Sequence, residues 1–342
     1  MIRPYRPKSW LTVLALAAAF VASGAFPRTQ ATAADTTELL PRDPTAWLNS
    51  PPLSVDALKG KGVVLWFFEE QCPRCRAKWP GMYDLAKRFE GQPVVFIAVN
   101  SGTSPIEVAQ YAREVKLTWP IIVDPSRQYE KLWWDQEISL QNIHQVGLIL
   151  PTGGQQPGRW DDLEGSVKTA LEGASWKIDP KTIPAVFLPT WQSIELGNYA
   201  AAASLVKKGL VTKNPEVKAA ATKVNAFVQS EIQSATERAA KARSDGDAWK
   251  AYQLYNGITN SFAGYDLPAE ISAGLKDLQS DSKVKREVAA AKALEGIQKS
   301  LLAARSDTAR KRIASRLEQF ISQYADSEAA VSARQLIRDG QP

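Results

Sequence analysis

Two cysteines, Cys72 and Cys75, form the only Cys-x-x-Cys motif in the sequence. At this spacing the two sulfurs can close a disulfide across one helical turn. An apolar run at residues 63–68 precedes the pair and an amphipathic pattern through residues 77–89 follows it, so Cys72 is expected at or near the N-terminus of a helix. Unpaired N–H groups and the positive end of the helix dipole favour a thiolate there. The motif therefore predicts a redox-active dithiol, with Cys72 and Cys75 as its catalytic residues.

Three basic residues, Arg74, Arg76 and Lys78, lie within about one helical turn of the thiols. Neighbouring positive charge stabilises a thiolate and lowers the pKa of a thiol. We therefore predict that these three residues tune the thiol chemistry.

Composition excludes several other kinds of site. The 342 residues include two cysteines and one histidine, which rules out a multi-cysteine zinc framework, an iron–sulfur cluster within one chain, and any centre that needs two histidines. The net charge is +6, from 42 Lys and Arg against 36 Asp and Glu. Because the bases alternate with acids along the predicted helices, we expect no nucleic-acid partner.

The N-terminal residues 1–34 have the features of a secretory signal peptide. A basic start leads into an apolar stretch at residues 10–22, and the small-residue run at 31–34 offers a cleavage site. If the apolar stretch stays uncleaved, it becomes a membrane anchor. Either outcome predicts an exported protein, periplasmic, in the cell envelope or secreted, in a compartment where disulfides persist.

Residues 35–175 alternate between strand-like and helix-like patterns. This alternation predicts an α/β domain with a central sheet flanked by helices. Apolar runs predict strands at residues 62–68, 94–99, 121–123 and 147–150, and apolar residues three to four apart predict helices at 80–89 and 106–115. A Pro-Thr-Gly-Gly turn at residues 151–154 predicts that the last strand enters a hairpin.

The remaining sequence predicts a different architecture. Prolines in residues 176–195 are typical of a linker, and residues 196–342 are Ala-rich with helical periodicity and no strand pattern. Three loosely similar helix–turn–helix segments favour a separate all-α, tetratricopeptide-like domain, although a plain helical bundle fits the pattern too. Helix pairs of this kind usually bind protein partners, so we expect an unidentified protein partner here.

The stretch of residues 58–68, followed by the Cys-x-x-Cys motif and Trp79-Pro80, resembles the thioredoxin-like superfamily. The most similar branch is the exported, TlpA-like thiol–disulfide oxidoreductases, and the resemblance covers about residues 50–172. It implies a thioredoxin fold and protein thiols or disulfides as substrates. It also implies that Cys72 is an exposed attacking thiol and Cys75 a buried resolving thiol, with no cofactor beyond their disulfide.

The sequence departs from that family in the loop expected to face the cysteines. Ile143, His144 and Gln145 stand where the family has a proline that is normally cis. Cis peptide bonds without proline cost about 3 kcal/mol, so this loop is expected to be trans or otherwise rearranged.

The family's buried acid is missing as well. Trp66 holds its position on the strand, and Lys78 holds the related position on the helix. Glu69 and Glu70 stand just before the motif, where two carboxylates are expected to oppose the cationic helix end.

Two alternatives to redox catalysis stay open. Two thiolates and one imidazole suit Cu(I) or Zn(II), so Cys72, Cys75 and His144 could make the chain a copper-binding chaperone of thioredoxin fold. The cysteines could instead form a structural disulfide in a non-catalytic adaptor. The leading hypothesis is an exported thiol–disulfide oxidoreductase that carries a helical protein-interaction domain.

Overall fold

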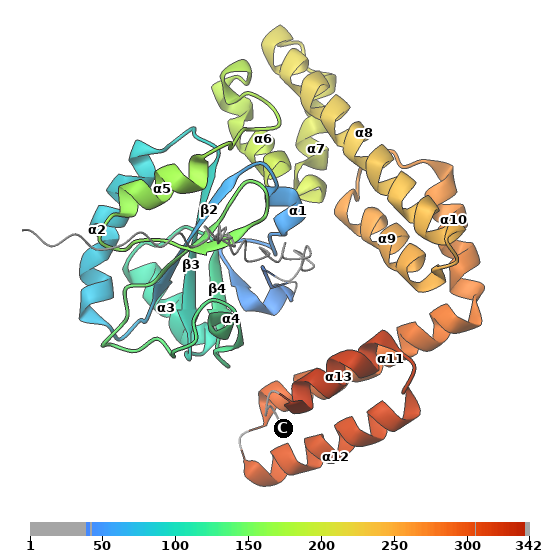
Figure 1. Cartoon of the computed structure of the whole chain (residues 1–342). Coiled ribbons are helices and arrows are strands. Elements are labelled where there is room, and N and C mark those ends of the chain that lie inside the picture. The colour runs from blue at the N-terminus through green and yellow to red at the C-terminus, as the bar shows by residue number, and fades with distance from the viewer. Residues whose placement is uncertain (1–38, 42, 305, 339–342) are drawn as a thin grey trace, which may run out of the picture. The chain divides into compact units, whose positions relative to one another are not determined.

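The computed structural model describes residues 39–41, 43–304 and 306–338. Their first part is built on a six-stranded sheet in the order β1-β4-β3-β2-β5-β6 (Figure 1). Strands β2, β3 and β4 are parallel, whereas β1, β5 and β6 pair antiparallel. The strand bounds are β1 Trp47–Leu48, β2 Gly62–Phe68, β3 Val94–Ser101, β4 Ile121–Asp124, β5 Val146–Ile149 and β6 Gln155–Pro157.

The central strand β2 explains why this sheet forms. All seven of its residues are buried, as expected for a continuous apolar run with neighbouring strands on both sides. Gly62 begins the strand where a Cβ atom would lie 2.2 Å from the carbonyl oxygen of Ala170, so only glycine fits there. The helices of this part are α1 Val55–Leu58, α2 Pro73–Arg88, α3 Pro105–Glu114, α4 Gln128–Lys131 and α5 Leu163–Leu171.

This arrangement confirms the predicted thioredoxin-like α/β fold. The strand predicted at residues 62–68 matches β2, and the predicted helices at 80–89 and 106–115 fall within or beside α2 and α3. The predicted turn joins β5 to β6, with Gly153 at a φ of 89°, a conformation that favours glycine.

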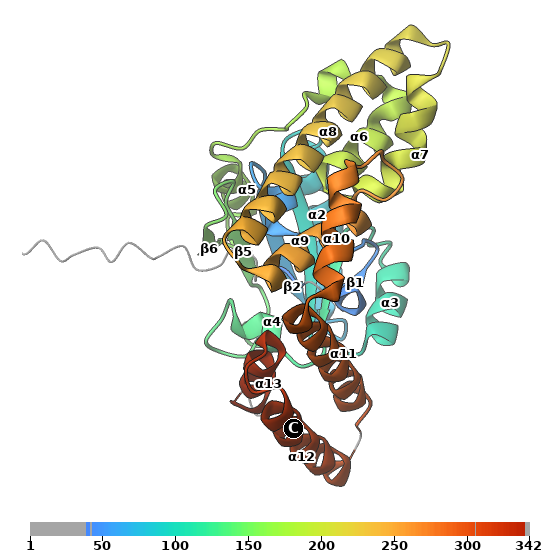
Figure 2. The same cartoon turned by 90° about the vertical axis from the view of Figure 1, so that its right-hand side faces the viewer.

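The C-terminal part is helical, as predicted (Figure 2). Its helices have very unequal lengths, from 30 residues in α8 to 8 in α6. The described residues thus confirm helical structure here, whereas a tetratricopeptide-like repeat stays a prediction. The helices are α6 Leu188–Glu195, α7 Tyr199–Leu210, α8 Pro215–Ser244, α9 Ala248–Ser261, α10 Ala269–Ser280, α11 Ser282–Ala303, α12 Asp307–Gln323 and α13 Glu328–Arg338.

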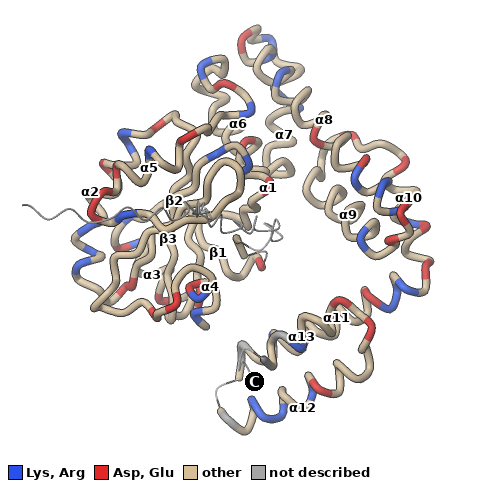
Figure 3. Tube along the Cα trace, viewed as in Figure 1, with Lys and Arg blue, Asp and Glu red and all other residues tan. Residues whose placement is uncertain are grey.

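Acidic and basic residues are mixed along these helices. Figure 3 shows Lys and Arg interspersed with Asp and Glu over α8 to α12. Pairs such as Lys241 with Asp245 and Arg286 with Asp326 are largely exposed, with 2.8 Å between their charged atoms. The charges of this part are therefore spread over solvated helix faces.

Residues 176–195 are not the linker that their prolines predicted. They hold two short 3₁₀ helices, Pro180–Thr182 and Ala185–Phe187, followed by α6. A proline fits the first turn of a helix, because its missing N–H would be unpaired there anyway. The apolar side chains around the prolines are then free to pack into the core of the helical part. Those buried are Ile178, Ile183, Phe187, Trp191 and Ile194.

A buried ion pair joins the start of β2 to α6. The Lys61 ammonium lies 2.8 Å from the Glu195 carboxylate, and both side chains are fully buried. Burial lowers the pKa of Lys61, and the hydrogen bond to Glu195 opposes that shift. Glu195 also accepts hydrogen bonds from the N–H groups of Ile178, at 2.6 Å, and Lys177, at 3.3 Å.

The predicted signal peptide at residues 1–34 lies outside the described residues. Within the part of the chain that the structure describes, no helix is both long and apolar enough to span a bilayer.

Candidate functional site

Cys72 caps the N-terminus of α2. Its Sγ atom accepts a hydrogen bond from the N–H of Cys75 at 3.2 Å, and Pro73 occupies the first helical position. The N–H of Cys72 in turn donates to the carbonyl oxygen of Glu69 at 3.2 Å. The predicted place of Cys72 at a helix N-terminus is therefore correct, and both thiols are free.

The expected exposure of Cys72 is wrong. Its relative exposure is 1%, and that of Cys75 is 0%. The Cys72 side chain turns back onto the helix end to accept the Cys75 N–H, and it packs in the hydrophobic core that surrounds the sheet. A protein substrate therefore reaches Cys72 only if the covering groups move.

Burial governs the acidity of Cys75. Removal from water disfavours the thiolate and raises the pKa of Cys75 to about 12, and the hydrogen bond with Cys72 adds to the increase. A backbone hydrogen bond with Glu69 opposes the increase, and the charges of Cys72 and Glu69 add to it. Cys75 is therefore a protonated thiol at neutral pH.

We expect the reduced protein to lose stability above pH 9 because of Cys75. Between its ordinary pKa of 9.0 and about 12, the unfolded state binds fewer protons at this thiol than the folded state does. The free energy of unfolding then falls by up to about 1.4 kcal/mol per pH unit from this group. Urea unfolding in reductant should show the stability of wild type relative to Cys75→Ala falling as the pH rises from 8 to 10. A difference that is the same at every pH would contradict the raised pKa.

The three predicted tuning cations interact with different groups. Arg76 pairs with Glu114 at 3.0 Å, and its guanidinium carbon lies 4.9 Å from the centre of the Tyr111 ring. Arg74 and Lys78 act on His144, whose pKa is lowered by burial and then by these two charges. Their predicted effect on the thiols stays a prediction.

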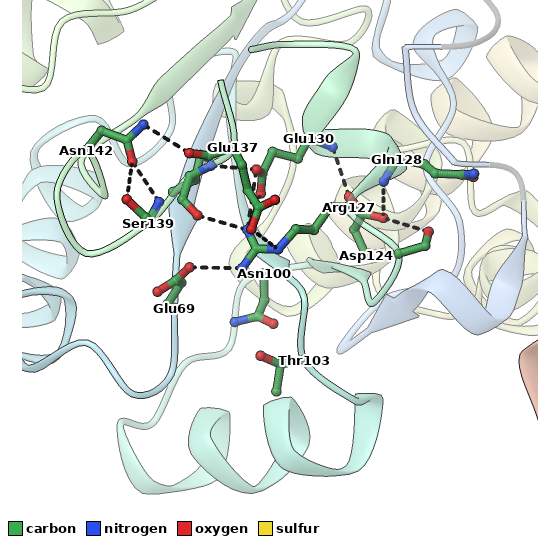
Figure 4. A network of polar contacts seen from close by, with 12 residues as sticks. Glu69, Asn100, Thr103, Asp124, Arg127, Gln128, Glu130, Glu137, Ser139 and Asn142 are labelled. Atoms are coloured by element: carbon green, nitrogen blue, oxygen red, sulfur yellow. Dashed lines mark hydrogen bonds and ion pairs between the residues drawn. The ribbon is translucent and has the colours of Figure 1, made fainter. Parts of the chain in front are cut away.

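Glu69 and Glu70 each have partners away from the cationic helix end, although the charge of Glu69 still raises the pKa of Cys75. Glu69 pairs with Arg127 at 3.2 Å (Figure 4). Glu70 accepts hydrogen bonds from Asn100 at 3.2 Å and Thr103 at 2.7 Å. Both carboxylates thus bind groups at the ends of β3 and β4, which lie far away in the sequence.

The loop at residues 143–145 lies beside the end of β2, the strand that leads to the cysteines, because His144 is next to Trp66 and Gln145 bonds to Phe67. No peptide bond in the described residues is cis, so this loop is trans, as expected. The carbonyl oxygen of Gln145 accepts the Phe67 N–H at 3.1 Å, and Ile143 is 1% exposed.

His144 lies between two tryptophans. Its ring centre is 6.2 Å from that of Trp66 and 5.2 Å from that of Trp160. The Nδ1 atom of His144 and the indole nitrogen of Trp66 are buried without a hydrogen-bond partner. Trp66 and the exposed Lys78 occupy the two positions where the resemblance implies an acid, and neither carries a carboxyl group.

The structure does not bring Cys72, Cys75 and His144 together as metal ligands. In the described ranges, no three His, Cys, Asp or Glu side chains converge as they would around an ion. The alternative of a Cu(I) site needs three ligands close to one point, and the described residues do not provide them.

Sequence analysis missed Arg127, Asn100 and Thr103. Arg127 follows an Asp-Pro-Ser turn, and only its φ of 58°, unusual for any residue except glycine, marks it as special. Such a conformation has no signal in the pattern of apolar residues.

Comparison with known proteins points to the same part of the chain. Residues 46–136 match the AhpC/TSA family model. The thiol–disulfide oxidoreductase ResA of Bacillus subtilis is 35% identical over 80 residues, 23% of this chain and 45% of that protein. ResA of Geobacillus thermodenitrificans is 36% identical over 123 residues, 36% of this chain and 61% of that protein. The chain thus spans about half the length of these relatives.

A solved structure with some likeness is that of a secreted Mycobacterium tuberculosis disulfide oxidoreductase homologous to E. coli DsbE. It is 19% identical, covers 40% of this chain and 98% of its own, and has a TM-score of 0.31.

Proposed function

We propose that the chain is an exported thiol–disulfide oxidoreductase that acts on protein thiols and disulfides through Cys72 and Cys75. The observation that carries the proposal is the Cys72 Sγ atom at the N-cap of α2, 3.2 Å from the N–H of Cys75. Helix N–H groups aimed at a sulfur stabilise its thiolate, which is the attacking species in exchange. The ResA relatives carry the same activity in their names.

The proposed roles follow from the position of Cys72 at the N-cap of α2 and from the raised pKa of Cys75. To reduce a substrate, the Cys72 thiolate attacks one sulfur of the substrate disulfide, the substrate S–S bond breaks, and the other substrate sulfur leaves as a thiolate. Cys75 then loses its proton and attacks the Cys72 sulfur. The Cys72–Cys75 disulfide forms, and the second substrate thiolate is released. Two electrons pass to the substrate, and the reverse sequence oxidises it.

The proposed export of the protein depends on the sequence alone. The basic start, the apolar stretch and the small residues at 31–34 support a signal peptide or an anchor. An exported location also gives the dithiol an environment in which its disulfide persists.

The helical residues 196–342 have the proposed role of binding a protein partner. They contain no cysteine or histidine, so the thiol chemistry lies entirely in the thioredoxin-like part. In the Cys72→Ser/Cys75→Ser variant, exchange should disappear while partner binding stays. Loss of both together would contradict this division of roles.

Redox titration with turnover tests the proposed activity. The Cys72–Cys75 couple should titrate reversibly in a glutathione or dithiothreitol buffer, and the protein should catalyse reduction of a protein disulfide. Cys72→Ser/Cys75→Ser, checked for folding by circular dichroism, should show only the uncatalysed rate. A potential below about −300 mV together with no turnover would mean a structural disulfide, and the proposal would be wrong.

A further inference from the structure

The turn between β2 and α2 is held by side chains from distant parts of the sheet. The active-site turn, residues 69–71, joins the central strand to the helix that begins at the thiols. Glu69 binds Arg127, and Glu70 binds Asn100 and Thr103. Because the Glu69 carbonyl oxygen also accepts the Cys72 N–H, the position of Glu69 is transmitted directly to the first thiol.

Arg127 is unusually well held for a side chain that is 22% exposed. Its Nη1 atom lies 3.0 Å from the Glu130 carboxylate and 2.9 Å from the Ile138 carbonyl oxygen. Its Nη2 atom lies 3.2 Å from Glu69, and its Nε atom lies 3.3 Å from Glu137. A planar guanidinium with several acceptors has one orientation, so Arg127 is a rigid anchor for Glu69.

The backbone of Arg127 supports the same conclusion. Its φ of 58° lies in the left-handed region, which is unfavourable for a residue with a Cβ atom. Such strain persists only where surrounding contacts compensate for it. Glycine would avoid the strain but would lose every contact of the guanidinium. The guanidinium also packs against Gly102, where a Cβ atom would lie 2.7 Å from Arg127 Nε.

The groups around Arg127 are themselves fixed. Glu130 is buried and accepts the Ile138 N–H at 2.6 Å. The Asp124 carboxylate, at the end of β4, accepts the N–H groups of Gln128 and Glu130, each at 2.9 Å. Figure 4 shows Glu130 and Glu137 around the Arg127 guanidinium, with Glu69 reaching it from the active-site turn.

We propose that Arg127 is a positioning residue for thiol–disulfide exchange, which holds Glu69 and neutralises its carboxylate so that Cys75 does not face an unpaired negative charge. The inference rests on the proposed function. It concerns the second step of exchange, in which Cys75 must lose its proton to attack Cys72.

The groups near Cys75 determine whether the loss of Arg127 slows or speeds the attack of Cys75 on Cys72. Burial raises the pKa of Cys75 most, a backbone hydrogen bond with Glu69 opposes the increase, and the negative charges of Cys72 and Glu69 add to it. In the mixed disulfide, the Cys72 sulfur carries no charge. On the side of α3, Tyr111 has its own pKa raised to about 12 by burial, so it is neutral at pH 7. On the side of the facing loop, His144 has a lowered pKa and is neutral as well. Glu69 is then the carboxylate whose neutralisation matters most for Cys75.

A chromogenic disulfide measures the step directly. Reduced protein is mixed with 5,5′-dithiobis(2-nitrobenzoate) at pH 4 to form the mixed disulfide on Cys72, and the pH is then raised to 7. Attack by Cys75 releases nitrothiobenzoate in a unimolecular phase that needs no protein substrate. We expect Arg127→Gln to slow this phase about threefold and Glu69→Gln to speed it by a similar factor, because the thiolate fraction of Cys75 falls when a negative charge faces it and rises when that charge is removed. Glu69→Gln/Arg127→Gln should come close to wild type.

Arg88→Gln is the matched control, because Arg88 lies on α2 and pairs with the half-exposed Glu164 at 3.4 Å. It should leave the rate unchanged. Equal slowing in Arg127→Gln and Glu69→Gln, or no change in either, would overturn the proposal. If Arg127→Gln fails to fold, the acceleration in Glu69→Gln still decides it. If Arg127→Gln slows the unimolecular phase and Glu69→Gln speeds it, but the protein reduces no protein disulfide, the role of Arg127 is supported. Only the proposed function is then contradicted.

Discussion

Cys75→Ser should accumulate a mixed disulfide with protein substrates, whereas Cys72→Ser should accumulate none. Cys72 accepts the N–H of the second cysteine at the helix end, so it is the sulfur placed for attack. Cys75 is fully buried, and burial raises its pKa to about 12, so it is suited to resolve an intermediate rather than to start one. Either change should lower turnover on the order of 10³-fold, because each removes one of two required thiolates.

Non-reducing electrophoresis followed by mass spectrometry reads out the trapped species. The double variant Cys72→Ser/Cys75→Ser supplies the background. Equal trapping by the two single variants would show that the roles are not divided between the sulfurs as assigned. Trapping by Cys72→Ser alone would reverse them.

Lys61→Met should destabilise the protein by about 3–5 kcal/mol. It removes the partner of Glu195, whose carboxylate is fully buried 2.8 Å from the Lys61 ammonium. An uncompensated buried charge is far more costly than a broken surface pair. The loss is measurable as a lower midpoint of chemical unfolding, provided that the transition is a single step.

A second variant tests whether the lost stability comes from the unpaired charge of Glu195 or from the changed packing at residue 61. Lys61→Met/Glu195→Gln removes both charges and keeps an acceptor for the N–H of Ile178, so it should recover much of the lost stability. Lys241→Met is the surface control, because its pair with Asp245 is exposed, and it should cost less than 1 kcal/mol. If Lys61→Met behaves like that control, the buried pair does not stabilise the junction between the sheet and α6.

Local patterns in the sequence determined the part of the fold that carries the thiols. The apolar run of β2, the apolar spacing along α2 and the Cys-x-x-Cys motif each depend on neighbours within a few residues. Together they predicted a strand, a turn and a helix with Cys72 at its N-terminus. The Ala-rich periodicity of residues 196–342 predicted helices for the same reason.

Only the tertiary structure decided what surrounds the thiols and how the two parts join. The burial of Cys72, the pairing of Glu69 with Arg127 and the pairing of Lys61 with Glu195 all depend on side chains brought from elsewhere in the chain. The prolines in residues 176–195 suggested a linker because a local pattern cannot show that the apolar residues around them have a core to enter. Contacts between segments more than 50 residues apart are set by how strands and helices pack, and no spacing within a single segment encodes that packing.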